Sequence, residues 1–342
     1  MNTVARTLLA MLALPVADAG AQARLPIIDM HLHIRKADYI GPNPPAMCTP
    51  FTIMPRWDNA RSAEQGFEFN EPPCENPIPA ATTDSAVMNG TIEVMRRRNI
   101  IGMVSGEPEE MVKWQSVAGD RIIPGLDLRI GSPSGASHVK TRTPAEIRGL
   151  HSRGAFTVLG EVLAQYQGVA ANDERLAPYW ALAEELGIPV AIHMGSGGPA
   201  DPYLGSPGFR ARNSSPLLLE EVLVKHPRLR VYIMHAGYPM LDDLRALLFV
   251  HPQVYVEVGS IVYAEPRAAF YRYLEGIVEA GYADRVMFGS DQMIWPGIIE
   301  PSIQAIEDAP FLSAQQKRDI LYNNAARFLR LSKKEIAKHH SM

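Results

Sequence analysis

Cysteine is scarce in this chain: Cys48 and Cys74 are the only two in 342 residues. No Cys-x-x-Cys pair occurs, which disfavours a thiolate metal site and thioredoxin-type redox chemistry. Both cysteines lie in one Pro-rich segment, residues 38–82. We expect them to pair as a disulfide if the protein is exported to an oxidising compartment. The alternative is two unpaired thiols in a loose loop.

Long apolar runs and basic runs are also missing. After residue 23, no segment is long and apolar enough to be a membrane helix, so we expect no membrane span. Lys and Arg number 33 against 37 Asp and Glu, a net charge of −4. No basic run is long enough to follow a nucleic-acid backbone, which disfavours a nuclease without excluding one. The expected partner is a small-molecule substrate, and a homo-oligomer stays open.

Residues 1–23 have the pattern of a secretory signal peptide. Arg6 gives a weakly positive start, residues 7–16 are apolar, and Ala21-Gln22-Ala23 offers a small-residue cleavage site. An apolar run of about ten residues is too short to span a bilayer. We therefore predict cleavage after Ala23, or else after Ala19, and a secreted or periplasmic protein. A buried amphipathic helix is the alternative reading of this segment.

Eight apolar, β-rich runs follow, and most of them end in a polar residue. Near-continuous apolar runs are typical of parallel strands buried on both faces. These runs are Pro26–His33, Ile100–Ser105, Arg121–Arg129, Phe156–Glu161, Pro189–His193, Arg230–His235, Val254–Ser260 and Arg285–Asp291. The segments with helical periodicity are Asp84–Arg98, Pro108–Ala118, Pro144–Arg153, Glu174–Leu186, Leu217–Lys225, Pro239–Leu248, Arg267–Glu279, Ile298–Asp308 and, as a closing helix, Ala314–Leu331.

This alternation predicts an α/β fold, a (β/α)₈ TIM barrel over residues 24–332. A doubly wound open sheet is disfavoured, because no Gly-rich fingerprint follows the first strand. The Pro-rich segment interrupts the pattern directly after the first strand, so we expect a lid insertion over the mouth of the barrel at residues 38–82. Residues 333–342 are predicted to be a polar C-terminal tail.

The first predicted strand carries Asp29-Met30-His31-Leu32-His33. Side chains at i and i+2 of a strand share a face, so His31 and His33 project together with Asp29 beneath them. Two imidazoles can bind one metal ion, and a carboxylate beneath them can orient a ring. On its own the motif fits an ordinary pair of partly buried histidines equally well.

Further polar residues end the other predicted strands. In a barrel the carboxyl ends of all strands meet at one mouth, even when they are far apart in sequence. A lone histidine at a strand end is more often a satisfied core group, but six such residues make coincidence improbable. The candidate cluster is His31, His33, Glu161, His193, His235 and Asp291.

With these motifs the chain resembles the amidohydrolase superfamily over residues 25–332. The branch is that of aminocarboxymuconate semialdehyde decarboxylase, pyrone dicarboxylate lactonase and related metal-dependent hydrolases. The motifs are Asp-Met-His-Leu-His at 29–33, Ala-Ile-His-Met at 191–194, Tyr-Ile-Met-His-Ala-Gly at 232–237, Met-Phe-Gly-Ser-Asp at 287–291 and Tyr-Asn-Asn-Ala-Ala-Arg-Phe-Leu at 322–329.

The resemblance implies a divalent metal held by His31, His33, His193 and Asp291. Many members carry a carboxylated lysine at the end of the fourth strand, and this chain has Glu161 at that place. In some relatives a glutamate at the same place bridges two metals. Three imidazoles and a carboxylate suit zinc, with manganese or iron(II) as alternatives. We expect one ion, or two if Glu161 bridges.

The implied activity is hydrolysis of a small lactone, ester or amide by a water that the metal activates. Asp291 would take and return the proton, and His235 would stay off the metal and act on the substrate. The same groups suit a non-oxidative decarboxylase. Two further alternatives are a metal-dependent nuclease or phosphodiesterase of the deoxyribonuclease type and a binding protein without turnover.

Substrate contacts are harder to predict than the metal ligands. Arg129 ends the third predicted strand, and its guanidinium could clamp a substrate carboxylate. Arg56 and Trp57 lie in the predicted lid and are candidate substrate-binding residues. Trp295 closely follows Asp291 and is expected to wall the pocket.

Overall fold

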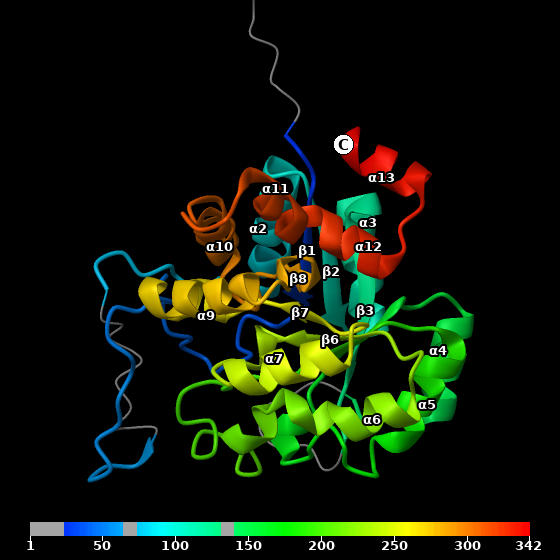
Figure 1. Ribbon diagram of the computed structural model, residues 1–342. Coiled ribbons are helices and arrows are strands. Elements are labelled where there is room, and N and C mark those ends of the chain that lie inside the picture. The colour runs from blue at the N-terminus through cyan, green and yellow to red at the C-terminus, as the bar shows by residue number, and fades with distance from the viewer. Residues whose placement is uncertain (1–23, 64–73, 131–139) are drawn as a thin grey trace, which may run out of the picture.

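The computed structural model describes residues 24–63, 74–130 and 140–342, so the predicted signal peptide lies outside the described residues. Eight parallel strands follow one another around a single sheet in the order of the sequence. They are β1 (Ile27–His33), β2 (Ile100–Gly106), β3 (Ile122–Leu128), β4 (Val158–Val162), β5 (Val190–His193), β6 (Val231–Met234), β7 (Tyr255–Glu257) and β8 (Val286–Met287). Helices surround these strands (Figure 1).

Backbone hydrogen bonds bring the two edges of the sheet together. The Met30 amide donates to the Phe288 carbonyl over 2.9 Å, and the Asp291 amide donates to the His31 carbonyl over 2.8 Å. The residues after β8 are thereby joined to β1. The predicted (β/α)₈ TIM barrel is confirmed.

The helices match most of the predicted segments, and Pro108–Ala118 and Arg267–Glu279 agree with the predicted bounds. The helices are α2 (Asp84–Arg97), α3 (Pro108–Ala118), α4 (Pro144–Ser152), α5 (Ala177–Leu186), α6 (Glu220–Lys225), α7 (Leu241–Val250), α8 (Ile261–Ala264), α9 (Arg267–Glu279), α10 (Ile299–Glu307), α11 (Ala314–Arg318), α12 (Asn324–Leu329) and α13 (Lys333–His340). A π-helical turn at Asp319–Asn323 joins α11 to α12.

The apolar core has two layers. The larger lies between the strands and the surrounding helices. The smaller joins apolar side chains from most of the strands and therefore fills the barrel below the mouth; Tyr322 and Phe328 cover its amino end. The strand residues of this inner layer are Ile28, Met30, Ile101, Met103, Val158, Ala191, Tyr232, Met234 and Met287.

The register of β1 changes between Asp29 and Leu32, an interval that includes His31. Asp29 pairs with Gly102 and Leu32 pairs with Val104, so β1 carries one more residue than β2 over this interval. Such a bulge interrupts the strict alternation of faces and re-aims the side chains that follow. The prediction that Asp29 lies beneath both imidazoles assumed an unbroken alternation of faces, which β1 does not have.

The predicted polar tail forms a helix, α13. The Ser332 side chain accepts from the Glu335 amide, and the Glu335 carboxylate accepts from the Ser332 amide, which is a capping box. Near its end, His339 is buried, with its Nδ1 3.0 Å from the Tyr322 hydroxyl. The segment is polar, and this cap and this contact hold it as a helix.

The Pro-rich segment, residues 38–82, is cross-linked within itself and hydrogen-bonded to α8. Cys48 and Cys74 form a disulfide, as predicted. Met47 and Ile78 exchange two backbone hydrogen bonds of 2.8 Å, and the Phe51 amide donates to the Ala264 carbonyl of α8 over 3.0 Å. The segment leaves the blue end of β1 and extends away from the barrel (Figure 1). Its role as a lid stays a prediction.

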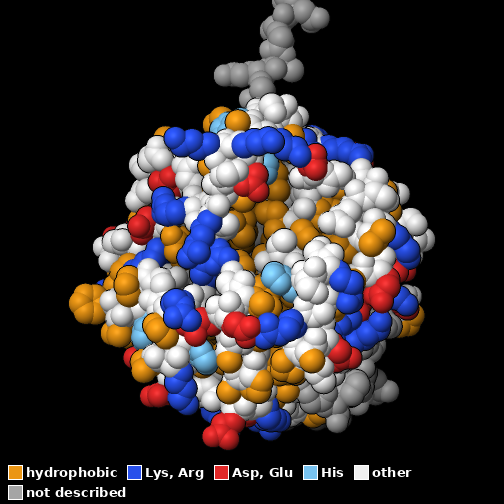
Figure 2. Space-filling view, turned by 90° about the vertical axis from the view of Figure 1, so that its right-hand side faces the viewer, with side chains coloured by type: hydrophobic (Ala, Val, Ile, Leu, Met, Phe, Trp, Pro, Cys, Tyr) orange, Lys and Arg blue, Asp and Glu red, His pale blue; other side chains and the backbone are white. Residues whose placement is uncertain are grey.

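Among the described residues, every helix is too short or too polar to pass through a lipid bilayer. Figure 2 shows one face of the molecule, on which basic and acidic side chains are interspersed with apolar patches. This mixture is consistent with the nearly balanced charge of the sequence.

Candidate active site

Six ionisable side chains gather at the carboxyl ends of the barrel strands, and none is more than 7% exposed. They are His31 and His33 on β1, Glu161 on β4, His193 on β5, His235 directly after β6 and Asp291 after β8. These are the six residues of the predicted cluster. The fold therefore brings together groups that lie up to 260 positions apart in the chain.

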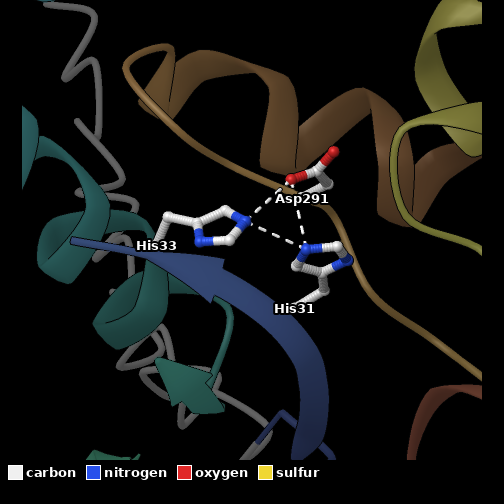
Figure 3. A group of neighbouring side chains, drawn as sticks. All are labelled: His31, His33 and Asp291. Atoms are coloured by element: carbon white, nitrogen blue, oxygen red, sulfur yellow. Dashed lines mark hydrogen bonds and ion pairs between the residues drawn. The ribbon is translucent and has the colours of Figure 1, made fainter. Parts of the chain in front are cut away.

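Three of these groups meet around one point (Figure 3). The Nε2 atoms of His31 and His33 lie 3.0 Å apart. Asp291 Oδ1 lies 3.3 Å from the first and 3.1 Å from the second. Two nitrogens and one carboxylate oxygen thus converge as they would on a single ion.

Glu161 connects this triad to the other two histidines. Its Oε2 lies 3.3 Å from His33 Nε2, and its Oε1 lies 2.6 Å from His193 Nδ1. His235 Nε2 lies 3.0 Å from the same nitrogen of His193. One oxygen of Glu161 thus faces the histidines of β1 and the other faces His193, as in a bridging carboxylate. The number of ions stays a prediction.

Glu257, at the end of β7, belongs to the site and was missed by sequence reasoning. It is fully buried, and its Oε2 lies 2.8 Å from His31 Nδ1. A carboxylate on the far nitrogen of a ligating histidine fixes the orientation and tautomer of the ring. The one signal in the sequence was an acidic residue inside the apolar run Val254–Ser260.

Two glycines make room for the Glu257 carboxylate. A Cβ on Gly289 would lie 2.2 Å from Glu257 Oε1, and a Cβ on Gly259 would lie 2.5 Å from the same atom. At either distance the Glu257 carboxylate or the backbone would have to move. The Gly-Ser-Asp sequence at 289–291 therefore supplies Asp291 and, through Gly289, leaves space for the Glu257 carboxylate.

Asp29 supports the backbone and does not orient a ring. Its Oδ1 accepts from the amides of His31 and Ser290, each over 3.0 Å. Burial raises its pKa to about 7. Glu257 occupies the orienting position that the sequence analysis had assigned to Asp29.

The donor set fits a divalent cation. If His31 Nδ1 donates to Glu257, the lone pair of the neutral ring at Nε2 faces His33 Nε2 and the Asp291 carboxylate, and these groups repel without a positive charge between them. Burial lowers the pKa of His31, but the carboxylates of Asp291 and Glu257 outweigh it and hold the pKa well above its usual value. The site thus favours a positive charge, which a divalent ion would supply.

The two carboxyl groups of the cluster are held in their charged forms. Burial would raise the pKa of Glu161, but the neighbouring rings of His193, His235 and His31 lower this pKa well below its usual value. Burial would likewise raise the pKa of Asp291, and the nearby charge of His31 lowers it. Both groups are therefore available as anionic ligands.

The backbone around the cluster is strained. His235, Ala236, Ser260 and Asp291 all have positive φ, between 50° and 63°. Residues with a Cβ rarely adopt this region, and such residues concentrate at functional sites. All four lie within four residues after the end of β6, β7 or β8.

A cavity of about 800 Å³ opens onto the cluster. Five cluster residues contribute to its polar lining: His33, Glu161, His193, His235 and Asp291. Its apolar wall comes largely from the segment after β1 and from α8. This wall includes Tyr39, Ile40, Met47, Phe51, Met54, Leu163, Ile261, Tyr263 and Trp295. A cavity of this size is large enough for a small organic substrate.

The predicted substrate contacts divide into two groups. Arg129 and Trp295 line the cavity, and only 5% of Arg129 is exposed. Arg56 and Trp57 are not among the lining residues. Arg56 is exposed, and the Trp57 ring packs against the ring of Tyr203, with centroids 4.9 Å apart. The structure therefore does not place Arg56 and Trp57 at the cavity.

Residues 28–331 match the model of a protein family described as amidohydrolase. The predicted resemblance to the amidohydrolase superfamily is thereby confirmed. Among proteins with curated descriptions, none matches the sequence significantly.

Several solved structures share the fold. An uncharacterised TIM-barrel protein from Bordetella bronchiseptica aligns with a TM-score of 0.59 at 18% identity, covering 92% of this chain and all of that one. 5-Carboxyvanillate decarboxylase from Sphingomonas paucimobilis aligns with a TM-score of 0.55 at 14% identity, covering 90% of this chain and all of that one. A probable 2-pyrone-4,6-dicarboxylic acid hydrolase from Acinetobacter baumannii, with citric acid bound, aligns with a TM-score of 0.52 at 18% identity. This alignment also covers 90% of this chain and all of that one.

Proposed function

Because the chain belongs to the amidohydrolase family, whose model covers residues 28–331, we propose that it is a metal-dependent hydrolase of a small lactone, ester or amide. The observation that carries this proposal is the convergence of His31 Nε2, His33 Nε2 and Asp291 Oδ1 within 3.3 Å of one another at the floor of a cavity. We favour zinc as the ion, because imidazole and carboxylate ligands suit it.

The ion would be held by His31, His33, His193 and Asp291, with Glu161 as the residue that decides between one ion and two. A divalent ion in this position lowers the pKa of a water molecule and polarises a carbonyl group. The fixed tautomer that Glu257 imposes on His31 keeps its Nε2 directed at the ion.

Asp291 is the proton carrier of the proposed reaction. It lines the cavity and faces the histidines of β1. In this position it takes a proton from the attacking water and returns it to the leaving oxygen or nitrogen.

His235 stabilises charge that develops on the substrate oxygen. Its Nδ1 donates to the Gly259 carbonyl over 2.9 Å, which leaves Nε2 on the side of the cluster. Burial would lower the pKa of His235, but Glu161 and Asp291 raise it above its usual value. A protonated ring can then donate to the oxyanion.

A second candidate function is non-oxidative decarboxylation. A decarboxylase is among the proteins that share the fold, and in that reaction His235 would help to deliver a proton to carbon. A panel of lactones, esters, amides and aromatic acids separates the two functions. The hydrolase releases acid without carbon dioxide, and the decarboxylase releases carbon dioxide from an acid.

Elemental analysis tests the metal directly. The purified protein should contain a divalent metal, and the His193→Ala variant should contain less. A metal at 100 times its dissociation constant stabilises the fold by about 2.7 kcal/mol, so chelation should lower the melting temperature. Turnover that is unaffected by complete chelation would contradict the proposal. A metal-loaded protein inert across the whole panel would favour a binding protein.

We also propose that the protein works outside the cytoplasm after losing residues 1–23. The disulfide between Cys48 and Cys74 supports an oxidising compartment. N-terminal sequencing of the protein from its native host should begin at Arg24. A start at Met1 would exclude cleavage.

A further inference from the structure

One nitrogen of His193 faces the cluster, and the other has no partner. Nδ1 lies 2.6 Å from Glu161 Oε1. Nε2 is buried and has no hydrogen-bond partner among the described residues. Buried polar atoms in native proteins are nearly always paired, so this nitrogen calls for an explanation. His31 differs, since the Glu257 carboxylate lies 2.8 Å from the nitrogen of its ring that faces away from His33.

A second unpaired atom belongs to a residue of the same small pocket. This pocket is lined by His193, Gln165 and Asn213 and otherwise by apolar side chains. Gln165 lies in the short 3₁₀ turn after β4, Ala164–Gln167, and is only 3% exposed. Its Oε1 is buried and lacks a partner within the described ranges. An amide oxygen accepts and an imidazole N–H donates, so the two side chains can satisfy each other.

The side-chain amide of Gln165 is held in one orientation. Its Nε2 donates to the Gly195 carbonyl over 2.9 Å and to Ser214 Oγ over 2.8 Å, and Ser214 donates to the same carbonyl. A reversed amide would turn its oxygen toward the Gly195 carbonyl, and two acceptors would face each other. Gly195 is itself packed against the cluster, because a Cβ there would lie 2.8 Å from His235 Cδ2. Oε1 of Gln165 is therefore a fixed acceptor.

The position of the His193 ring proton decides whether the two unpaired atoms can pair. With the proton on Nδ1, the ring donates to Glu161, and both Nε2 and Gln165 Oε1 are acceptors. With the proton on Nε2, the ring can donate to Oε1, and the lone pair of Nδ1 faces the cluster. A cation binds to that lone pair. Gln165 therefore favours the tautomer that binds an ion, as Glu257 does for His31.

We propose that Gln165 is a positioning residue for His193: its side-chain oxygen accepts from Nε2 and keeps the Nδ1 lone pair directed at the proposed ion. This inference rests on the proposed function for the ion, but not on the reaction that the ion supports. Loss of a partner of this kind weakens metal binding by about 10- to 100-fold. Because the amide is uncharged, we expect the lower end of this range.

Gln165→Met tests the inference, because methionine keeps the length and apolar stem of glutamine and removes its amide. The zinc affinity of the full-length protein, measured by competition with a chromophoric chelator, should fall about tenfold. A second readout is the Nε2–H proton of His193 in zinc-loaded protein with labelled histidine. In the wild type this proton should resonate downfield and exchange slowly with water. In the variant it should move upfield and exchange faster.

Two matched controls separate this role from packing. Ser214→Ala removes one hydrogen bond to the Gly195 carbonyl but leaves the bond from Gln165. Asn213→Ala removes the other polar side chain of the pocket apart from His193. Both variants should keep the wild-type zinc affinity and the His193 Nε2–H signal.

Three results would overturn the inference. They are unchanged zinc affinity in Gln165→Met, an equal loss in either control variant, and an Nε2–H signal that does not move in Gln165→Met. If Gln165→Met does not fold, the zinc-loaded wild type decides: the His193 Nε2–H proton should show a nuclear Overhauser effect to the Gln165 side chain, and its absence would refute the contact.

The outcomes also separate this inference from the proposed function. Zinc affinities and signals as expected, with no turnover of any compound in the panel, would refute only the hydrolase. Wild-type zinc affinity of Gln165→Met in a protein that does turn over the panel would refute only the role of Gln165. A wild-type protein that binds no divalent ion would refute both.

Discussion

The two ends of the barrel differ in how completely their buried polar side chains are hydrogen-bonded. At the amino end, Tyr322 pairs with His339, and Asn99 donates to the carbonyls of Arg24 and His339 and accepts from Arg121. At the carboxyl end, side-chain atoms remain unpaired within the described part of the chain. They belong to Asp29, His33, Arg35, Gln165, His193, Ser290 and Gln292, all on β1 or β5 or in the stretches after β1, β4 and β8.

The amino end therefore contributes to the stability of the fold, and the carboxyl end holds the groups suited to bind an ion and a substrate. A closed set of hydrogen bonds stabilises the amino end without any ligand. The carboxyl end combines positive φ, close carboxylates and unpaired atoms, which together favour a bound ion and substrate. Substitutions at the two ends should therefore affect different measurements.

Replacement of Asp291 by Asn should have the largest effect. The change removes the proton carrier and one anionic ligand, so we expect kcat to fall by about 10³-fold. The melting temperature of the metal-free protein should change little by comparison. Steady-state kinetics and metal content measure the effect. Activity within a few-fold of wild type would remove Asp291 from the mechanism.

Glu257→Gln should weaken metal binding by about 10- to 100-fold, because His31 would lose its charged orienting partner. Competition with a chromophoric chelator measures the affinity. Glu265→Gln is the matched control, since Glu265 lines the cavity but pairs with Tyr238 outside the cluster. Equal affinities in both variants would mean that packing alone orients the His31 ring.

Tyr322→Phe tests the amino end. Loss of the hydroxyl that meets His339 should cost about 1 kcal/mol of unfolding free energy. It should leave kcat and metal affinity unchanged. Urea denaturation and steady-state kinetics check both parts. A loss of activity at native conditions would show that the two ends are coupled.

Asp201→Asn should have the smallest effect, visible as a pH dependence. Burial raises the pKa of Asp201, a cavity-wall residue, from 3.8 to about 6. The folded state therefore binds the proton more tightly than the unfolded chain. Its contribution to stability is fully present below about pH 4 and is lost as the pH rises through about 6. As the pH rises over this range, the melting temperature of the wild type should fall relative to that of the variant. A difference in melting temperature that does not change with pH would contradict the raised pKa of Asp201.

Most of the fold could be predicted because each strand is a nearly uninterrupted apolar run. The predicted strands overlap all eight observed ones, although β8 is much shorter than its run, Arg285–Asp291. The six cluster residues could be predicted because a barrel gathers its strand ends at one mouth. Their roles as ligands or proton carriers are left to the experiments above.

Other features could not be predicted because they depend on pairing across the fold. The bulge in β1 arises from its register with β2. Arg35 donates to Asp127, which is 92 positions away, and neither belongs to a recognisable motif. The helix at Lys333–His340 is anchored by a buried histidine that a polar segment does not reveal.

The segment after β1 supplies much of the outer cavity wall, yet within the described residues none of the six cluster side chains comes from it. The cluster and much of the cavity wall are thereby encoded in different parts of the chain. Evolution or a protein engineer could exchange residues 39–54 to admit new molecules while the catalytic groups stayed where the strands hold them.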